Sequence, residues 1–142
     1  MGIIQLKIRY SINKGDFTTS PEISQMFGEI IGIWVITALQ QYAHLKRWNL
    51  VEMGPGKGTL SCDIIRTFKQ LNMLSKMTFY YVEISETLKT AQQENIIDAL
   101  RKENIFVSQD MDTKDLYDEE LDLKFVWKKN LQQISKEEFE KK

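Results

Sequence analysis

The segment from Leu50 to Leu60 constrains the fold of this chain more than any other. It reads Leu-Val-Glu-Met-Gly-Pro-Gly-Lys-Gly-Thr-Leu, an apolar run followed by three alternating glycines and the start of a helical pattern. Glycine has no Cβ, so its backbone can adopt a positive φ and lie directly against a ligand. The order of strand, glycine loop and helix N-terminus therefore predicts an α/β fold with a site for an adenosine-type cofactor.

The spacing of Gly54, Gly56 and Gly58 separates three kinds of glycine loop. A phosphate-binding P-loop requires a glycine where this chain has Val51, and Ser or Thr where it has Gly58. The dinucleotide fingerprint requires its third glycine at the position of Thr59. The remaining pattern, Gly-x-Gly-x-Gly, favours S-adenosylmethionine over NAD.

Two acidic residues accompany the loop. Glu52 precedes Gly54 by two positions, and Glu83 ends the next apolar run, 25 residues beyond Gly58. A carboxylate at the end of the second strand can accept hydrogen bonds from both ribose hydroxyls of a nucleotide. The alternative is a flexible surface turn, with Glu83 as a solvated charge at the end of a strand.

The composition indicates one globular domain and excludes several other classes. The chain has 142 residues, 42% of them hydrophobic, and its 19 basic residues nearly balance 20 acidic ones. This balance does not favour nucleic-acid binding. One cysteine, Cys62, and one histidine, His44, form no metal-ligand cluster, and no apolar run reaches the roughly 18 residues of a membrane span.

A long helix is expected before the glycine loop. Thr19 and Ser20 can each cap its N-terminus, and the pattern continues to about Tyr42. Apolar residues recur at helical spacing and predict one inward stripe: Ile23, Met26, Phe27, Ile30, Ile31, Trp34, Val35, Ala38 and Leu39. Gly28 and Gly32 lie one turn apart and favour close packing, in which another backbone approaches the helix; the alternative is that they are only tolerated inside it.

Strands and helices then alternate. The expected strands are 49–53, 78–84 and 123–127, and the expected helices are 59–74 and 85–104. Inward positions of the two helices are Leu60, Ile64, Ile65, Phe68, Leu71, Leu88, Ala91, Ala99 and Leu100. The architecture is βαβαβ with parallel strands, which is half of a nucleotide-binding sheet. Three strands would leave a sheet edge and apolar helix surface uncovered.

Two further segments are expected to lack regular structure. Residues 108–122 hold seven acidic residues against a single lysine, which is typical of a solvated loop, and no calcium-loop pattern occurs there. The charged tail at 135–142 is expected to fray. At the other end, residues 1–14 carry three basic residues and no acidic one, which is weakly similar to a transit peptide.

The chain resembles the MidA family. The resemblance rests on Gly-Asp-Phe-Thr-Thr-Ser-Pro-Glu-Ile-Ser-Gln-Met-Phe-Gly-Glu at 15–29 and Glu-Met-Gly-Pro-Gly-Lys-Gly-Thr-Leu at 52–60. Val-Glu-Ile-Ser at 82–85 and Val-Trp at 126–127 match further family motifs, so the similarity covers about 15–134. It implies the N-terminal half of a Rossmann-like class I methyltransferase domain. Its implied function is S-adenosyl-L-methionine-dependent methylation of arginine on a subunit of respiratory complex I, during assembly in the mitochondrial matrix.

The resemblance also implies the cofactor site, whose members are Glu52, Gly54, Pro55, Gly56, Gly58, Glu83 and Ile84. The glycines would contact the methionine portion of the cofactor, and Glu52 would lie near its ammonium group. Glu83 would hold the ribose, and Ile84 would lie beside the adenine. Three residues of the helix entry would close over the cofactor: Asp16, Thr19 and Glu22.

This sequence departs from the family pattern in two places. The family continues into a fourth strand with an acidic and aromatic motif near the transfer site, which is absent here, and residues 1–14 do not align. The sequence thus assigns no catalytic residue. Two alternatives remain open: a truncated, inactive chain that binds cofactor weakly or only packs against a partner, and an NAD-dependent oxidoreductase half-domain, which Thr59 disfavours.

Overall fold

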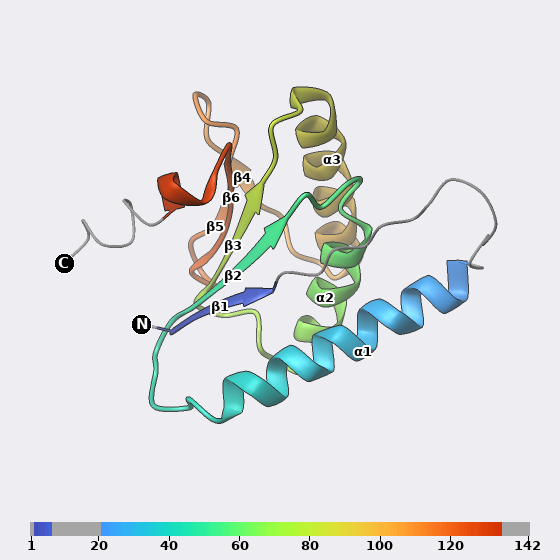
Figure 1. Cartoon of the computed structure of the whole chain (residues 1–142), viewed down its shortest axis with the longest axis vertical. Coiled ribbons are helices and arrows are strands. Elements are labelled where there is room, and N and C mark those ends of the chain that lie inside the picture. The colour runs from blue at the N-terminus through green and yellow to red at the C-terminus, as the bar shows by residue number, and fades with distance from the viewer. Residues whose placement is uncertain (1, 7–20, 135–142) are drawn as a thin grey trace.

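The computed structural model describes residues 2–6 and 21–134, and Figure 1 shows its elements. They are β1 (Gly2–Leu6), α1 (Pro21–Gln40), β2 (Trp48–Met53), α2 (Thr59–Gln70), β3 (Met77–Val82), α3 (Glu86–Lys102), β4 (Ser108–Gln109), β5 (Leu116–Asp118) and β6 (Leu123–Lys128). The expectations for the helix caps at Thr19 and Ser20, for Asp16 closing over the cofactor and for the 135–142 tail lie outside the described residues. Glu22 lies in α1, but its side chain is not described. The alternating order confirms the predicted α/β class.

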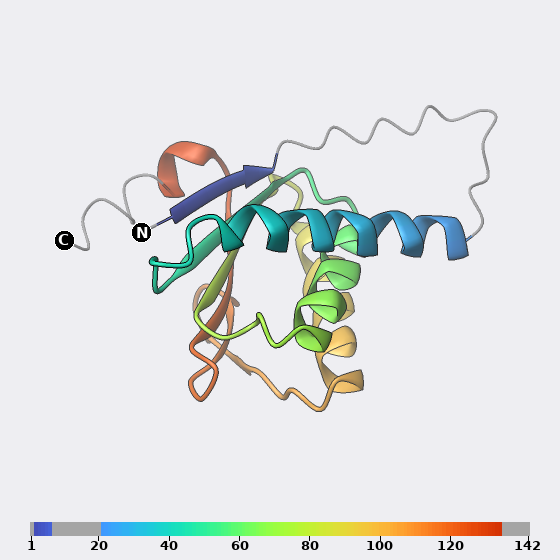
Figure 2. The same ribbon diagram turned by 90° about the horizontal axis from the view of Figure 1, so that it is seen from below.

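The described strands form one mixed sheet in the order β1-β2-β3-β6-β5-β4. The first four are parallel, and β5 pairs antiparallel with both β6 and β4. Each connection from β1 to β2, β3 and β6 moves in the same direction across the sheet. Right-handed crossovers then place all three helices on the same face, as Figure 2 shows.

The expectation of three strands was wrong for the described part of the chain. β1 falls in the segment that aligned with nothing, and it pairs with the edge of β2 that was expected to be uncovered. β4 and β5 fall in the acidic segment that was expected to be a solvated loop. There the carboxylates cap turns instead of repelling one another: Asp110 accepts from two backbone N–H groups and Asp118 from one, while Leu116 is buried.

The main core lies between the sheet and the helices. Strand positions alternate, so Leu50, Phe79 and Phe125 face α2 and α3, and the Phe79 and Phe125 rings stack with centroids 5.0 Å apart. The opposite face carries a smaller cluster around Val51 and Tyr80. In a doubly wound sheet, helices cover both faces. Here the cluster on the second face is completed by Ile134, from the turn at the end of the described residues.

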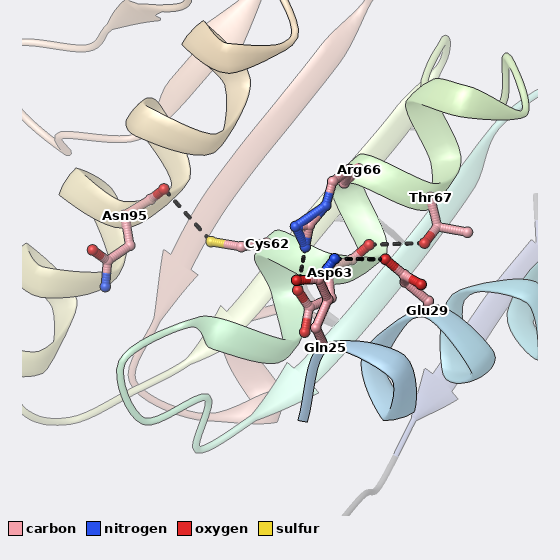
Figure 3. A network of polar contacts seen from close by, with 7 residues as sticks. All are labelled: Gln25, Glu29, Cys62, Asp63, Arg66, Thr67 and Asn95. Atoms are coloured by element: carbon pink, nitrogen blue, oxygen red, sulfur yellow. Dashed lines mark hydrogen bonds and ion pairs between the residues drawn. The ribbon is translucent and has the colours of Figure 1, made fainter. Parts of the chain in front are cut away.

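α1 packs closely against α2 at Gly28 and Gly32, as predicted, but the groups nearest the glycines are side chains of α2 rather than its backbone. A Cβ atom built on Gly28 would lie less than 3.0 Å from the Asp63 side chain, and one on Gly32 would lie 3.1 Å from Thr67. Figure 3 shows this interface, where Asp63 pairs with Arg66 and the Thr67 hydroxyl donates to the Asp63 carbonyl at 2.9 Å. The two glycines therefore allow α1 to approach α2 along its polar side.

The predicted inward stripe of α1 is only partly correct. Val35 and Leu39 are buried, but Met26, Ile30 and Trp34 are each more than half exposed. The buried face is narrow because it is centred on the two glycines, which places the outer half of the stripe on the surface. Leu71 was also expected to face inward and is 51% exposed, since α2 ends at Gln70 rather than at residue 74.

Candidate cofactor-binding site

The glycine loop and Glu83 lie side by side at the carboxyl ends of two neighbouring strands. The loop follows β2 and Glu83 follows β3, and these neighbouring strands run parallel. The Gly54 N–H donates to the Val82 carbonyl at 3.0 Å, which joins the two strand ends directly. In open α/β sheets ligands bind at the carboxyl ends of the strands, so both predicted features stand where a ligand is expected.

The backbone of the loop has the conformation that its glycines predict. Gly54, Gly56 and Gly58 have φ values of 62°, 60° and 82°. Among the described residues, a Cβ atom built on Gly54 or Gly56 would meet nothing within 4 Å, whereas one on Gly58 would lie 3.6 Å from Gln92. Two glycines thus border open space and the third packs against α3, and the loop fits a ligand that approaches the Gly54 and Gly56 backbone.

The N-terminus of α2 also faces this loop. Its N-cap is Gly58, whose N–H donates to the Pro55 carbonyl at 2.9 Å, and no side chain of the described ranges caps the helix. The first N–H groups of a helix lack partners within the helix and favour negatively charged or carbonyl oxygen atoms. A carboxylate, such as that of a methionine moiety, is the kind of group that this end can bind.

Glu83 is held in a fixed orientation by two donors. Its Oε1 accepts from the Ser85 backbone N–H at 3.0 Å, and its Oε2 accepts from the Gln92 amide at 3.2 Å. Ser85, where the third helix was expected to begin, is the N-cap of α3, and its hydroxyl accepts from the Leu88 N–H at 3.2 Å. Ile84 is 79% exposed beside this carboxylate and therefore offers an apolar surface to a flat ring.

Glu52 lies at the other side of the loop, near the end of β2. Burial raises the pKa of Glu52 from 4.5 to about 7. It lines a cavity of about 10 Å³ with Leu60 and Tyr81, among others. The Tyr81 hydroxyl is hydrogen-bonded to Ser61, and its pKa is raised by burial and by the charge of Glu52. A cationic group brought to Glu52 would therefore favour the ionised carboxylate.

A larger cavity adjoins Glu83 on the side away from the loop. Its volume is about 550 Å³, within the usual range for small-molecule sites. It is lined by Glu83, Glu86, Lys89, Asp112, Thr113, Asp115, Trp127, Lys128, Lys129 and Gln133.

Sequence reasoning missed Gln92 and Asn95, both on α3. The Gln92 amide donates to the Gly56 carbonyl at 2.7 Å, and the Asn95 amide donates to the Lys57 carbonyl at 2.8 Å. Gln92 is fully buried, in the polar middle of a helix whose pattern gave no sign of this contact. A signal existed only in the residue type, because a buried amide requires polar partners.

Among the described residues, no group of three or more His, Cys, Asp or Glu residues could hold a metal ion. Burial raises the pKa of the Cys62 thiol to about 11, which disfavours the reactive thiolate. Within the same part of the chain, no helix is long and apolar enough to cross a membrane.

Comparison with known proteins agrees with this geometry. Residues 30–140 match a family model described as "Putative S-adenosyl-L-methionine-dependent methyltransferase". A relative from Bos taurus, the mitochondrial protein arginine methyltransferase NDUFAF7, is 50% identical over 82 residues, which cover 56% of this chain and 19% of that protein. The human protein of the same name is 48% identical, with the same coverage.

A more distant relative, the NDUFAF7 homolog of Drosophila melanogaster, is 40% identical over 81 residues, covering 57% of this chain and 18% of that protein. The chain thus spans about a fifth of the length of these relatives. The family model, in contrast, covers more than half of the chain. The chain belongs to the MidA family of S-adenosyl-L-methionine-dependent methyltransferases.

Proposed function

We propose that this chain binds S-adenosyl-L-methionine as the cofactor-binding part of a protein arginine N-methyltransferase. The proposed substrate is a subunit of respiratory complex I, and the proposed location is the mitochondrial matrix. The observation that carries the proposal is the open backbone of Gly54 and Gly56 beside the oriented carboxylate of Glu83. The relatives named as mitochondrial protein arginine methyltransferases support the reaction and the compartment.

Each predicted residue has a task that its position allows. The loop N–H groups and the α2 N-terminus would bind the methionine carboxylate, and Glu52 would bind the ammonium group. Glu83 would accept hydrogen bonds from the ribose hydroxyls, while Ile84 and the adjoining cavity would receive the adenine. When bound, the cofactor supplies an electrophilic methyl group on its sulfonium. The chain's own residues bind it and fix its direction.

Methyl transfer further requires carboxylates that orient the guanidinium of the substrate. We assign none among the described residues. A second candidate therefore remains. In this alternative the chain is inactive, and it binds cofactor weakly or only packs against a partner.

Calorimetry tests the binding part of the proposal. The purified chain, shown by circular dichroism to be folded, is titrated with S-adenosylmethionine and separately with NAD. Selective binding of S-adenosylmethionine is expected. A folded chain that binds neither molecule would refute the cofactor assignment. A chain that prefers NAD would favour the oxidoreductase alternative instead.

Transfer is tested separately. The chain is incubated with cofactor carrying a radioactive methyl group and with purified complex I subunits, and labelled arginine is sought by mass spectrometry. Labelled arginine supports the enzyme. Cofactor binding without any transfer supports the inactive alternative, because it shows a working half-site with no acceptor chemistry.

A further inference from the structure

We propose that Gln92 is a positioning residue that holds the glycine loop and the Glu83 carboxylate in register with each other. This inference rests on the proposed function, since it concerns the same cofactor site. Gln92 lies on α3 and is 0% exposed, so the cofactor cannot reach it through solvent-facing atoms. Its effect on binding must therefore pass through the groups that it contacts.

The Gln92 amide bonds to three separate elements. Its Nε2 donates to the Gly56 carbonyl in the loop after β2, at 2.7 Å, and to Glu83 Oε2 after β3, at 3.2 Å. Its Oε1 accepts from Trp127 Nε1 on β6, at 2.9 Å. One side chain thus links three adjacent strands of the sheet at their carboxyl ends.

The three partners fix which way the amide points. The indole N–H of Trp127 can only donate, so it must face the amide oxygen. The Gly56 carbonyl and the Glu83 carboxylate accept, so they must face the two hydrogens of Nε2. No other side chain offers one acceptor and two donors at this length: a glutamate lacks the donors, and an apolar residue would leave buried groups without partners.

The consequence for binding is geometric. With Oε1 held by the Ser85 N–H and Oε2 by Gln92, the Glu83 carboxylate cannot rotate freely. The same amide holds the carbonyl of Gly56, whose open side is where the methionine portion would lie. The spacing between the two halves of the site is then set before the cofactor arrives, which lowers the cost of binding.

The neighbouring residue provides a matched control. Gln93 is also a buried glutamine on α3, but its amide donates to the Lys114 carbonyl at 3.0 Å, in the turn between β4 and β5. Gln93→Met removes a buried amide without touching the loop or Glu83. Any loss specific to Gln92→Met therefore reports on the cofactor site rather than on the packing of α3.

The test measures the affinity of the chain for S-adenosylhomocysteine by calorimetry. Gln92→Met is expected to weaken binding about tenfold or more, as for the loss of a hydrogen bond to a charged group. Gln93→Met is expected to change it less than about twofold. If Gln92→Met does not fold, Gln92→Asn replaces it, because its amide keeps the same donors and acceptor on a side chain one methylene shorter, which cannot reach all three partners at once.

A double-mutant cycle with Glu83→Ala separates positioning from a merely structural effect. If Gln92 acts partly through Glu83, its replacement costs at least about threefold less affinity in the Glu83→Ala background. Equal losses in both backgrounds would overturn the positioning role, as would equal binding by wild type and Gln92→Met. A folded wild-type chain without any binding would instead refute the proposed function, and the inference with it.

Discussion

Replacing Glu52 by glutamine is expected to stabilise the cofactor-free chain at alkaline pH and to weaken cofactor binding. Both effects follow from one feature, a carboxyl group that is partly buried beside the glycine loop. Its pKa lies at about 7 because burial disfavours the charged form. A neutral amide of nearly the same shape does not carry that cost.

The magnitude follows from the shift of the Glu52 pKa from 4.5 to about 7. The folded chain holds this proton more tightly than the unfolded chain, so it binds more protons between these two values. The free energy of unfolding therefore falls as pH rises through the window. Between about pH 5 and about pH 9 the fall attributable to Glu52 is about 2 to 3 kcal/mol.

Urea unfolding followed by tryptophan fluorescence measures this term. Wild type and Glu52→Gln are compared at about pH 5 and about pH 9, so that groups common to both proteins cancel. The advantage of the variant should grow by about 2 to 3 kcal/mol between the two conditions. Glu94→Gln serves as the control, because Glu94 is exposed on α3 and its replacement should give no such growth.

Two results would refute this reasoning in different places. An advantage that is the same at both pH values would mean that burial does not disfavour the charge of Glu52. Calorimetry at about pH 8 tests the second half, where Glu52→Gln should bind S-adenosylmethionine about tenfold more weakly through loss of the ammonium partner. Unchanged affinity would remove Glu52 from the site while leaving the stability argument intact.

Three further predictions concern other positions. Gly56→Val should abolish cofactor binding in calorimetry while circular dichroism stays that of a folded chain. The fold should survive, although φ is 60°, because the new Cβ meets no atom of the described residues. A folded variant that binds normally would contradict the loop assignment. Gly28→Ala should lower the free energy of unfolding by about 2 kcal/mol through its clash with Asp63, and Gly32→Ala by less; equal urea midpoints would contradict this. Cys62, with its pKa raised to about 11, should react with iodoacetamide at about pH 8 only after unfolding, and rapid labelling of the native chain would exclude the burial argument.

The parts of the fold that were predictable depend on local rules. A positive φ at Gly54 and the start of a helix near Ser85 follow from residue type and spacing alone, and the structure has both. The close packing of α1 against α2 could be predicted for the same reason, because Gly28 and Gly32, one turn apart in a helix, favour it. The strand ends then bring Glu83 to the loop through parallel topology.

The parts that failed depend on what lies opposite each residue. The exposure of Trp34 on α1 follows from how little of that helix the rest of the described chain covers, which periodicity cannot report. The sequence predicts mutual repulsion between Asp110, Asp118 and their acidic neighbours, because it does not show the backbone N–H groups that these two carboxylates accept from. Gln92 reads as a surface residue of a polar helix, and only the tertiary structure shows its three partners.

The candidate site contains groups that destabilise the folded chain when no cofactor is bound. Glu52 is held with a raised pKa, and Gly56 is held in a conformation that costs extra backbone entropy. Gln92 opposes these costs, because its buried amide joins Gly56, Glu83 and Trp127 with every polar atom satisfied. Ordering of the loop before binding and stability of the core therefore depend on the same side chain. A chain that lost this amide would keep its sheet but would have to order the site each time a cofactor bound.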